Sequence, residues 1–492
     1  MPDEPTARIH ARPGSGQRTG DAGSATPAKA SDGWRAPQHR DGIALVLSSG
    51  ISSGVGLLYW VIAARLFDPI TVGLNSTAIS AMTLIGSAAH LNMGNAMLRF
   101  VPVAGRRAAG LVAACFGIGI GVAALAGLVF ALGSGVWAHE LVDAFGFPTL
   151  LVFFVVSTPI WTIFVLQDAA LTAIKRANVV LLENFLFSVL KVAFLAGAAW
   201  FALAGGIALS WVIATAVSVV VVNVWLARAV RRVSAAAGPP AEPITVRDIG
   251  GFVRSDYAGN VCWQAAVFGL PLVVLAAIGP DGAATFGVVW QIAFALYLVP
   301  IGMGKSMVAH AAGRPDAADS ARRSMERKTL MLLVPGALVL AAGSYLVLSI
   351  FGRTYAETGT LLLVLLAVSA IPNAVTQATI WAARVRRRNA VLFAVPALLA
   401  AMVFGGTWVL LPVMGVTGAG VAWLGAQCLL AAGILLHRRF SRGSEPEQPA
   451  PAPVELDDAT RPLHLGPYDV HGAGIDDTMP LRLSPEEPRR TP

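Results

Sequence analysis

The sequence predicts an all-α polytopic membrane protein with twelve transmembrane helices in two six-helix lobes related by pseudo-two-fold symmetry, flanked by disordered cytoplasmic tails. Three observations support this prediction. The chain carries little charge, its apolar residues fall into twelve windows of about 20 residues, and its basic residues are concentrated in every second loop.

The charge content excludes a water-soluble enzyme. Of the 492 residues, 55% are apolar and only 13% are charged, whereas a soluble domain has about 25% charged residues. Between positions 43 and 436 the chain has only 23 basic and 13 acidic side chains. So little polar surface cannot cover a core of this size in water. A disordered chain is also excluded, because disordered chains are rich in charged residues.

The apolar windows have the length of membrane-crossing helices. Strands of a membrane barrel would be about 10 residues long with alternating polarity, and no such alternation occurs. The windows cover residues 43–64, 72–94, 109–133, 149–171, 179–201, 207–227, 258–279, 283–303, 329–350, 359–381, 390–411 and 418–436.

The basic residues predict the orientation. With the N-terminus inside, the cytoplasmic segments hold 33 Lys and Arg residues and the outer loops hold two, Arg65 and Arg353. This asymmetry follows the positive-inside rule, so both termini are expected to be cytoplasmic. The basic residues of the cytoplasmic loops, which border anionic lipid, also account for the net charge of +8. We therefore expect no nucleic-acid partner.

Composition divides the chain into five parts. Residues 1–42 and the Pro- and acid-rich residues 437–492 cannot bury enough apolar area to fold, and both are predicted to be disordered tails. An N-lobe (43–227) and a C-lobe (256–436) are separated by a polar cytoplasmic linker (228–255). Because each lobe has an even number of spans, both enter the membrane in the same direction, which permits a parallel repeat.

Polar residues recur at helical spacing inside several spans, as in the run Asn184, Ser188 and Lys191. Such stripes must face protein or water. Hydrogen bonding between helices explains small hydroxyl groups, but several stripes together indicate a hydrated cavity. The polar residues expected to line it are Asn184, Ser188, Asn260, Gln264, Asn373 and Gln377.

Lys191 is the most informative single residue because it lies near the middle of an apolar span. It either forms a buried pair with Glu183 or Asp256, or it faces a cavity. Glu183 is a poor partner, since eight residues on one helix correspond to about 12 Å. Cations in a cavity select for anions such as phosphate or pyrophosphate. Candidate substrate-binding cations are Lys191, Arg65, Arg99 and Arg254, although the arginines at span ends also suit membrane anchors.

The sequence contains no catalytic motif, so neither an enzyme nor a cofactor is predicted. No nucleophile–base pair or phosphate-binding loop is present. The three cysteines, Cys115, Cys262 and Cys428, are far apart in apolar runs and support neither a disulfide framework nor a metal site. Glu183 and Asp256 are the candidates for ion coupling.

Four segments resemble a known family. They are SSGISSGVGLLYWVIAARLFDPITVG (48–73), LNMGNAMLRFVP (91–102), IFGRTYAETGTLLLVLLAVSAIP (350–372) and PVMGVTGAGVAW (412–423). They are similar to polysaccharide-biosynthesis membrane proteins of the multidrug/oligosaccharidyl-lipid/polysaccharide exporter superfamily, over nearly the whole of residues 43–436. The drug extruders of that superfamily resemble the chain less, because its first apolar window has no acidic residue.

The resemblance implies a flippase of the O-antigen or teichoic-acid repeat-unit type in the bacterial cytoplasmic membrane. Its substrate would be a polyprenyl-(pyro)phosphate-linked oligosaccharide, translocated by alternating access, and its partners would be membrane lipids. Two alternatives are an ion-coupled exporter of a small amphipathic compound and a non-transporting scaffold. The scaffold would recruit glycosyltransferases or a polymerase through the tails.

Overall fold

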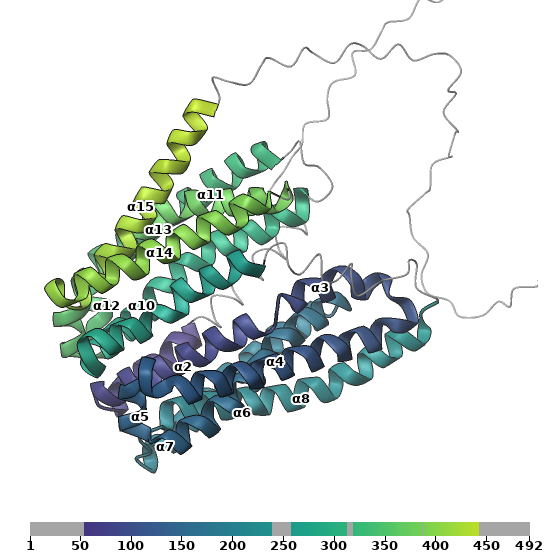
Figure 1. Ribbon diagram of the computed structural model, residues 1–492, viewed down its shortest axis with the longest axis horizontal. Helices are drawn as coiled ribbons and strands as arrows, with labels where there is room; N and C mark the ends of the chain where they lie inside the picture. The colour runs from purple at the N-terminus through teal and green to yellow at the C-terminus, as the bar shows by residue number, and fades with distance from the viewer. Residues whose placement is uncertain (1–53, 239–256, 312–317, 387, 442–492) are drawn as a thin grey trace, which may run out of the picture. The chain divides into compact units, whose positions relative to one another are not determined.

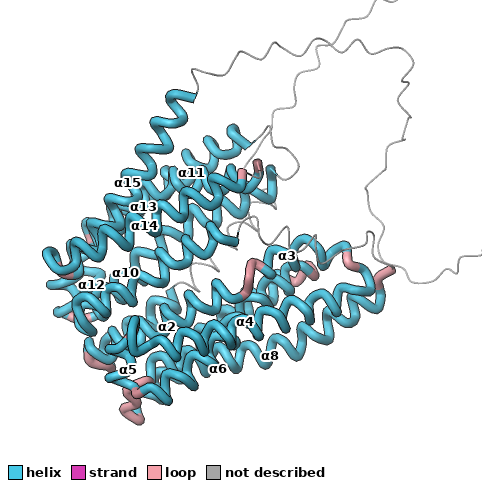
Figure 2. The backbone as a smooth tube through the Cα atoms, viewed as in Figure 1, coloured by secondary structure: helices cyan, strands magenta, loops and turns pink. Residues whose placement is uncertain are grey.

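A computed structural model describes residues 54–238, 257–311, 318–386 and 388–441. Within these ranges the backbone is almost entirely helical, with short connecting loops and no strand (Figure 2). The chain divides into two compact units, Met1–His437 and Arg438–Pro492. The first unit contains nearly all of the described helices, and the second begins inside the last helix.

In the first half of the chain, the described residues begin with a short helix, Gly54–Leu66, followed by seven α-helices (Figure 1). These are α2 (Pro69–Ala89), α3 (Met93–Phe100), α4 (Ala108–Trp137), α5 (His139–Phe145), α6 (Phe147–Ala173), α7 (Ala177–Trp200) and α8 (Gly206–Ala236).

In the second half, the described residues begin with a helix at 257–264 that continues through a π-helical turn, Ala265–Gly269. The helices that follow are α10 (Leu270–Ala311), α11 (Ala318–Ala342), α12 (Ser344–Phe351), α13 (Arg353–Val385), α14 (Asn389–Met414) and α15 (Val416–Ser441).

Local chemistry sets several of these boundaries. The Asp68 side chain caps α2 by accepting a hydrogen bond from the Thr71 backbone N–H at 3.0 Å, which satisfies a donor at the start of the helix. This hydrogen bond lowers the pKa of Asp68 against the smaller, opposing effect of its burial. The long helix α10 is interrupted at Gly279, which has φ +76. Glycine adopts this conformation without a steric penalty.

Nine described helices are long and apolar enough to cross a membrane, and the bent pair α11–α12 gives a tenth. The chain is therefore a multi-pass membrane protein. Most of the helices lie over the windows expected from the sequence, but α11 begins at Ala318, well before the expected window 329–350. α8 continues to Ala236, so the start of the expected linker is helical. The rest of that linker and nearly all of both tails lie outside the described residues.

Most helices pack against other helices of the same half. In the first half α4 and α8 pack on α6, and α7 packs on α8; in the second half α10, α11 and α14 pack on α13. The most extensive contact between the halves joins α2 to α10. It depends on Gly73, where an added Cβ would lie 2.1 Å from the carbonyl oxygen of Pro280.

Candidate functional site

Lys191 lies in an aromatic cage formed by three helices of the first half. Its side chain, on α7, is only 4% exposed. Its Nζ atom is 5.1 Å from the ring centroid of Tyr59, 5.0 Å from that of Phe187 and 4.5 Å from that of Trp211. All three distances are within the range of about 6 Å over which a cation is attracted to a ring face. The lysine is therefore surrounded by protein and not by lipid.

The rings of the cage are held in place by their own contacts. The Tyr59 hydroxyl donates a hydrogen bond to the Ile207 carbonyl oxygen at 2.7 Å and lies 3.0 Å from the Ser210 hydroxyl. Trp211 meets Tyr59 and Phe187 edge to face, with centroids 5.5 and 5.6 Å apart. These contacts keep the ring faces of Tyr59 and Phe187 directed at the ammonium group.

No acidic side chain neutralises Lys191 within the described part of the chain. None of the ion pairs there includes it. The alternative pair with Glu183 is not formed, because Glu183 accepts a hydrogen bond from Gln167 instead. The other alternative partner, Asp256, lies outside the described residues. The aromatic faces are therefore the observed counterpart of this charge.

Gly56 leaves space beside the ammonium group. A Cβ atom added at Gly56 would have one neighbour within 4 Å, the Nζ atom of Lys191 at 3.9 Å. Any larger side chain at this position would extend toward Lys191. Gly56 therefore places no side chain against the ammonium group.

A second group of buried polar side chains connects α8, α6 and α7. Asn223 donates a hydrogen bond to Gln167, and Gln167 donates one to Glu183. Glu183 is 1% exposed, and its Oε2 atom has no hydrogen-bond partner among the described residues. The Oδ1 atom of Asp168, next to Gln167 in the chain, is also buried without a partner there. This group is distinct from the cage.

The other predicted cations are placed differently. Arg65 donates hydrogen bonds to the carbonyl oxygens of Ile350 and Ser349, at 2.8 and 2.9 Å. The Arg99 guanidinium lies 5.4 Å from the ring centroid of its neighbour Phe100. Both arginines are exposed, and Arg254 lies outside the described residues. Their role in substrate binding stays a prediction.

The predicted lining residues have mixed environments. Ser188, Asn373 and Gln377 are buried, and neither amide atom of Asn373 has a partner in the described part. Asn184 donates a hydrogen bond to the Val180 carbonyl oxygen at 2.9 Å. Asn260 and Gln264 are half-buried. The structure does not gather these six residues around one described pocket, so a shared cavity stays a prediction.

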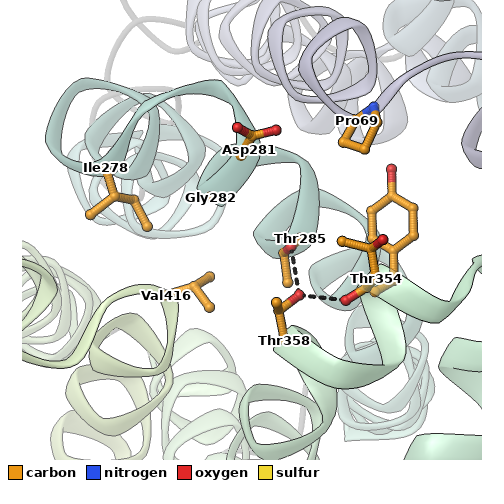
Figure 3. A pocket seen from close by; sticks show the side chains of 9 residues that line it. Pro69, Ile278, Asp281, Gly282, Thr285, Thr354, Thr358 and Val416 are labelled. Atoms are coloured by element: carbon orange, nitrogen blue, oxygen red, sulfur yellow. Dashed lines mark hydrogen bonds between the residues drawn. The ribbon is translucent and has the colours of Figure 1, made fainter.

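A pocket of about 240 Å³ lies elsewhere, between α2, α10, α13 and α15 (Figure 3). Its one charged residue is Asp281, and the hydroxyls of Thr285 and Thr358 approach to 3.1 Å beside it. None of the predicted site residues lines this pocket. Its full lining is Pro69, Ile278, Asp281, Gly282, Thr285, Thr354, Tyr355, Thr358 and Val416.

The described residues include no group of three or more His, Cys, Asp or Glu side chains arranged to hold a metal ion. The three cysteines are free.

Sequence reasoning missed the cage. One local signal was present, because Phe187 precedes Lys191 by four residues and residues at this spacing share a helix face. Tyr59 and Trp211 are separated from Lys191 by 132 and 20 residues. Only the tertiary fold brings them to the ammonium group.

Comparison with known proteins identifies the fold. No family model and no curated protein matches the sequence. An inward-facing multidrug resistance MATE family transporter of the MOP superfamily matches with a TM-score of 0.62 at 15% identity, over 80% of this chain and 94% of the other.

Two further solved structures agree. The lipid II flippase MurJ, in an inward closed conformation, matches with a TM-score of 0.58 at 10% identity, over 81% and 87% of the two chains. The MATE multidrug transporter DinF-BH matches with a TM-score of 0.58 at 14% identity, over 81% and 95%. The chain therefore has the fold of these transporters.

Proposed function

We propose that the chain is a flippase that moves a polyprenyl-(pyro)phosphate-linked oligosaccharide across the cytoplasmic membrane by alternating access, for cell-surface polysaccharide biosynthesis. The observation that carries the proposal is Lys191: a buried cation, held by aromatic faces, with no acidic partner among the described residues. In this proposal the chain acts as a transporter and has no catalytic site.

The charge of Lys191 has no acidic countercharge among the described residues. A charged group away from water is costly unless it is paired, and ring faces supply only about 2 kcal/mol of attraction when desolvated. A phosphate oxygen beside Lys191 would provide the rest of the compensation. Such a group would approach past Gly56, which has no side chain beside the ammonium group. Arg65, Arg99 and Arg254 are the weaker candidates for phosphate contacts.

The proposal includes twelve spans in two lobes. The run Tyr257–Lys305 counts as one helix by length, yet its break at Gly279 supports two spans. Gly54–Leu66 is apolar but short, and it would form a full span if it continued toward residue 43. With the bent pair α11–α12, these additions support twelve. Both termini would be cytoplasmic, and the tails would be available to glycosyltransferases or a polymerase.

Within this proposal the polar side chains of the spans have a secondary role. Asn184, Asn260, Gln264 and Gln377 would donate and accept hydrogen bonds with sugar hydroxyls, and Ser188 and Asn373 would support them. Glu183 and Asp256 are the candidates for ion coupling. The lipid chain would remain in the bilayer while the headgroup crosses.

A second candidate is an exporter of a small amphipathic compound. The MATE fold, together with the half-buried Asp168 and the buried Glu183, favours it, because acidic side chains attract cationic compounds. The absence of an acidic residue from the described first helix, Gly54–Leu66, argues against a cation site there. Uptake of a fluorescent cationic dye by vesicles containing the protein, abolished in Glu183→Gln, would support this candidate over the flippase.

The test of the flippase proposal is transfer of a fluorescent prenyl-pyrophosphate glycan in proteoliposomes. We expect Lys191→Ala to abolish transfer at an unchanged protein level, and Lys191→Arg to retain part of it. Lys328→Ala, which removes an exposed lysine of α11, is the matched control and should transfer normally. Normal transfer by Lys191→Ala would show that the cation is not needed.

A further inference from the structure

The pocket shown in Figure 3 lies where the two halves of the chain meet. Pro69 of α2 comes from the first half, and the other lining residues belong to α10, α13 and α15 of the second half. Next to the pocket, α2 and α10 are in close contact, since a Cβ added at Gly73 would lie 2.1 Å from the Pro280 carbonyl oxygen. A movement that separated α2 from α10 at this junction would therefore take the pocket apart.

The pocket is mostly apolar and is large enough for a small organic molecule. The side chains of Pro69, Ile278 and Val416 present only carbon atoms to it. Its volume is about 240 Å³, whereas an apolar cavity of about 150 Å³ already holds a benzene molecule. The pocket therefore has room for one ring of that size, or a branched alkyl group, together with a short polar arm.

Two polar side chains of the lining have no partner among the described residues. Tyr355 is 3% exposed, and its hydroxyl makes no hydrogen bond in the described ranges. None of the ion pairs there includes Asp281. The arginines nearest to the lining in sequence are engaged elsewhere. Arg65 donates to two carbonyl oxygens of α12, and Arg353 pairs with Glu357.

The threonines of the lining, by contrast, already have partners. The hydroxyls of Thr285 and Thr358 lie 3.1 Å apart, and that of Thr358 lies 2.8 Å from the Thr354 carbonyl oxygen. The groups left over are thus a carboxylate and a phenol, which both accept hydrogen bonds.

The chemistry of these leftover groups indicates what the pocket can bind. An ammonium group has only N–H donors, and it forms a charge-assisted hydrogen bond with a carboxylate such as that of Asp281. A tyrosine ring also attracts a cation. The apolar remainder of the lining suits a hydrocarbon group. A free sugar fits less well, because its many hydroxyl groups would lose their hydration in an apolar pocket without enough partners.

We propose that this pocket binds a small organic ammonium compound, a primary amine on a compact ring or branched alkyl group, and that the bound compound holds α2 against the second half. The site lies apart from Lys191, whose aromatic cage contributes none of the lining. The inference goes beyond the proposed function, and the site exists without a glycan.

A compound bound in this pocket would slow transport. Alternating access requires the two halves to separate at each end in turn, and only the closed junction of α2 and α10 keeps Pro69 beside Asp281. A ligand that binds one of two states shifts their ratio about 100-fold at about 100 times its dissociation constant. With both termini cytoplasmic, as proposed above, these helix ends face outside, and the compound would arrive from there.

The ligand class is tested with benzylamine and the full chain in lipid nanodiscs, by titration calorimetry and melting temperature. Benzyl alcohol is the matched probe, because it has the same ring without the charge. We expect benzylamine to bind saturably and to raise the melting temperature, and benzyl alcohol to do neither. Asp281→Asn should weaken binding at least about tenfold, as expected for the loss of a charge-assisted hydrogen bond, and Tyr355→Phe should weaken it less. Asp143→Asn, which removes an exposed acid of α5, should bind normally.

A variant that keeps the carboxylate tests the pocket itself. Val416→Phe would fill part of the apolar lining and should prevent binding. Val413→Phe is the matched control, because Val413 is 81% exposed and does not line the pocket. Melting temperatures without benzylamine check that each variant folds. Equal affinity for the two probes would overturn the proposed ligand, as would unchanged binding in both Asp281→Asn and Val416→Phe. Stabilisation by methyl glucoside in place of benzylamine would also overturn it.

The effect on the junction is tested by cysteine labelling, which needs no glycan. Ser349 lies where Arg65 joins the two halves. In a protein without its native cysteines, saturating benzylamine should slow the reaction of Ser349→Cys with a membrane-impermeant maleimide several-fold. Addition of Asp281→Asn should remove this protection. A labelling rate that benzylamine leaves unchanged would overturn the effect on the junction.

The effect on transport is tested in proteoliposomes. External benzylamine should slow glycan transfer several-fold in the unmodified protein and not in Asp281→Asn. Transfer at the full rate with saturating benzylamine would overturn the inhibitory role, and so would accumulation of radiolabelled benzylamine inside the vesicles, which would make it a cargo. If no glycan is transferred at all, the flippase proposal fails, and calorimetry and labelling still decide the pocket.

Discussion

Arg65 caps the C-terminal end of α12 through Ile350. Its Nε atom donates to the Ile350 carbonyl oxygen at 2.8 Å, and its Nη2 atom donates to the Ser349 carbonyl oxygen at 2.9 Å. The last carbonyls of a helix have no partner within it and carry partial negative charge. A guanidinium group suits this helix end because its parallel N–H groups donate to the carbonyl oxygens and its positive charge attracts their partial negative charge. The contact joins residues 285 positions apart and links the two halves of the chain.

We predict that Arg65→Gln weakens this connection. The variant loses the charge and the paired donors. A hydrogen bond to a charged group contributes about 1.5–3 kcal/mol to stability. The loss here should be smaller because Arg65 is exposed. In a protein without its native cysteines, Ser349→Cys should react faster with a membrane-impermeant maleimide when Arg65→Gln is also present than when Arg65 is retained. Arg353→Gln is the control, because Arg353 is 87% exposed and pairs with Glu357 on its own helix. Equal labelling rates at position 349 with Arg65 retained, with Arg65→Gln and with Arg353→Gln would contradict the prediction.

We predict that Gly73→Ala lowers the thermal stability of the protein in detergent. The added Cβ would lie 2.1 Å from the Pro280 carbonyl oxygen, so α2 and α10 would have to move apart. Overpacking of this kind costs about 1–3 kcal/mol. Gly121→Ala is the matched control, since nothing lies within 4 Å of its added Cβ. A melting temperature that falls equally in both variants would contradict a close crossing at Gly73.

We predict that Asp68→Ala destabilises the protein by about 0.5–1 kcal/mol, the lower part of the range for N-cap residues, because Asp68 is exposed. Asp68→Asn should lose less, since its side-chain oxygen still accepts from Thr71. The pKa of Asp68 is lowered in the folded protein. The stabilisation by its charge is therefore present above the unfolded pKa of about 3.9 and is lost as the pH falls through the folded value.

Melting temperatures measured from pH 7 to pH 3 test the cap. The difference between the unmodified protein and Asp68→Asn should shrink at the acid end. A difference that stays constant throughout would show that the charge of Asp68 contributes nothing.

We predict that Gly56→Leu blocks glycan transfer without unfolding the protein. The new side chain would extend toward Lys191 Nζ, which lies 3.9 Å from the position of an added Cβ, and would hinder the approach of a phosphate group from that side. Gly54→Leu is the control, because nothing lies within 4 Å of its added Cβ and Gly54 is exposed. Transfer by Gly56→Leu at the rate of the control would show that this space is not used.

The helical membrane fold could be predicted from the sequence because its causes are local. Length and apolarity of the windows determine where a chain can cross a bilayer, and the described helices follow those windows. The loop expected between residues 279 and 283 corresponds to the break at Gly279. The bend between α11 and α12 was not predicted, because the apolar window 329–350 continues across it.

The surroundings of the site residues could not be predicted. The sequence identified Lys191 as unusual because a lysine in mid-span is costly, and it correctly judged Glu183 a poor partner. It gave no means of pairing Lys191 with Tyr59 or Trp211, since cation–π contacts depend on tertiary packing. For the same reason, the two carbonyls that accept from Arg65 carry no signal in the sequence.

Binding of a prenyl pyrophosphate tests the central claim about Lys191 most directly. Trp211 lies against the ammonium group, so its fluorescence should report an anion that arrives there. We predict a saturable change with prenyl pyrophosphate and none with the uncharged prenol. The affinity should fall at least about tenfold in Lys191→Ala, as expected when a charge-assisted contact of about 1.5–3 kcal/mol is lost. Equal affinity in Lys191→Ala, or equal binding of the prenol, would contradict the account.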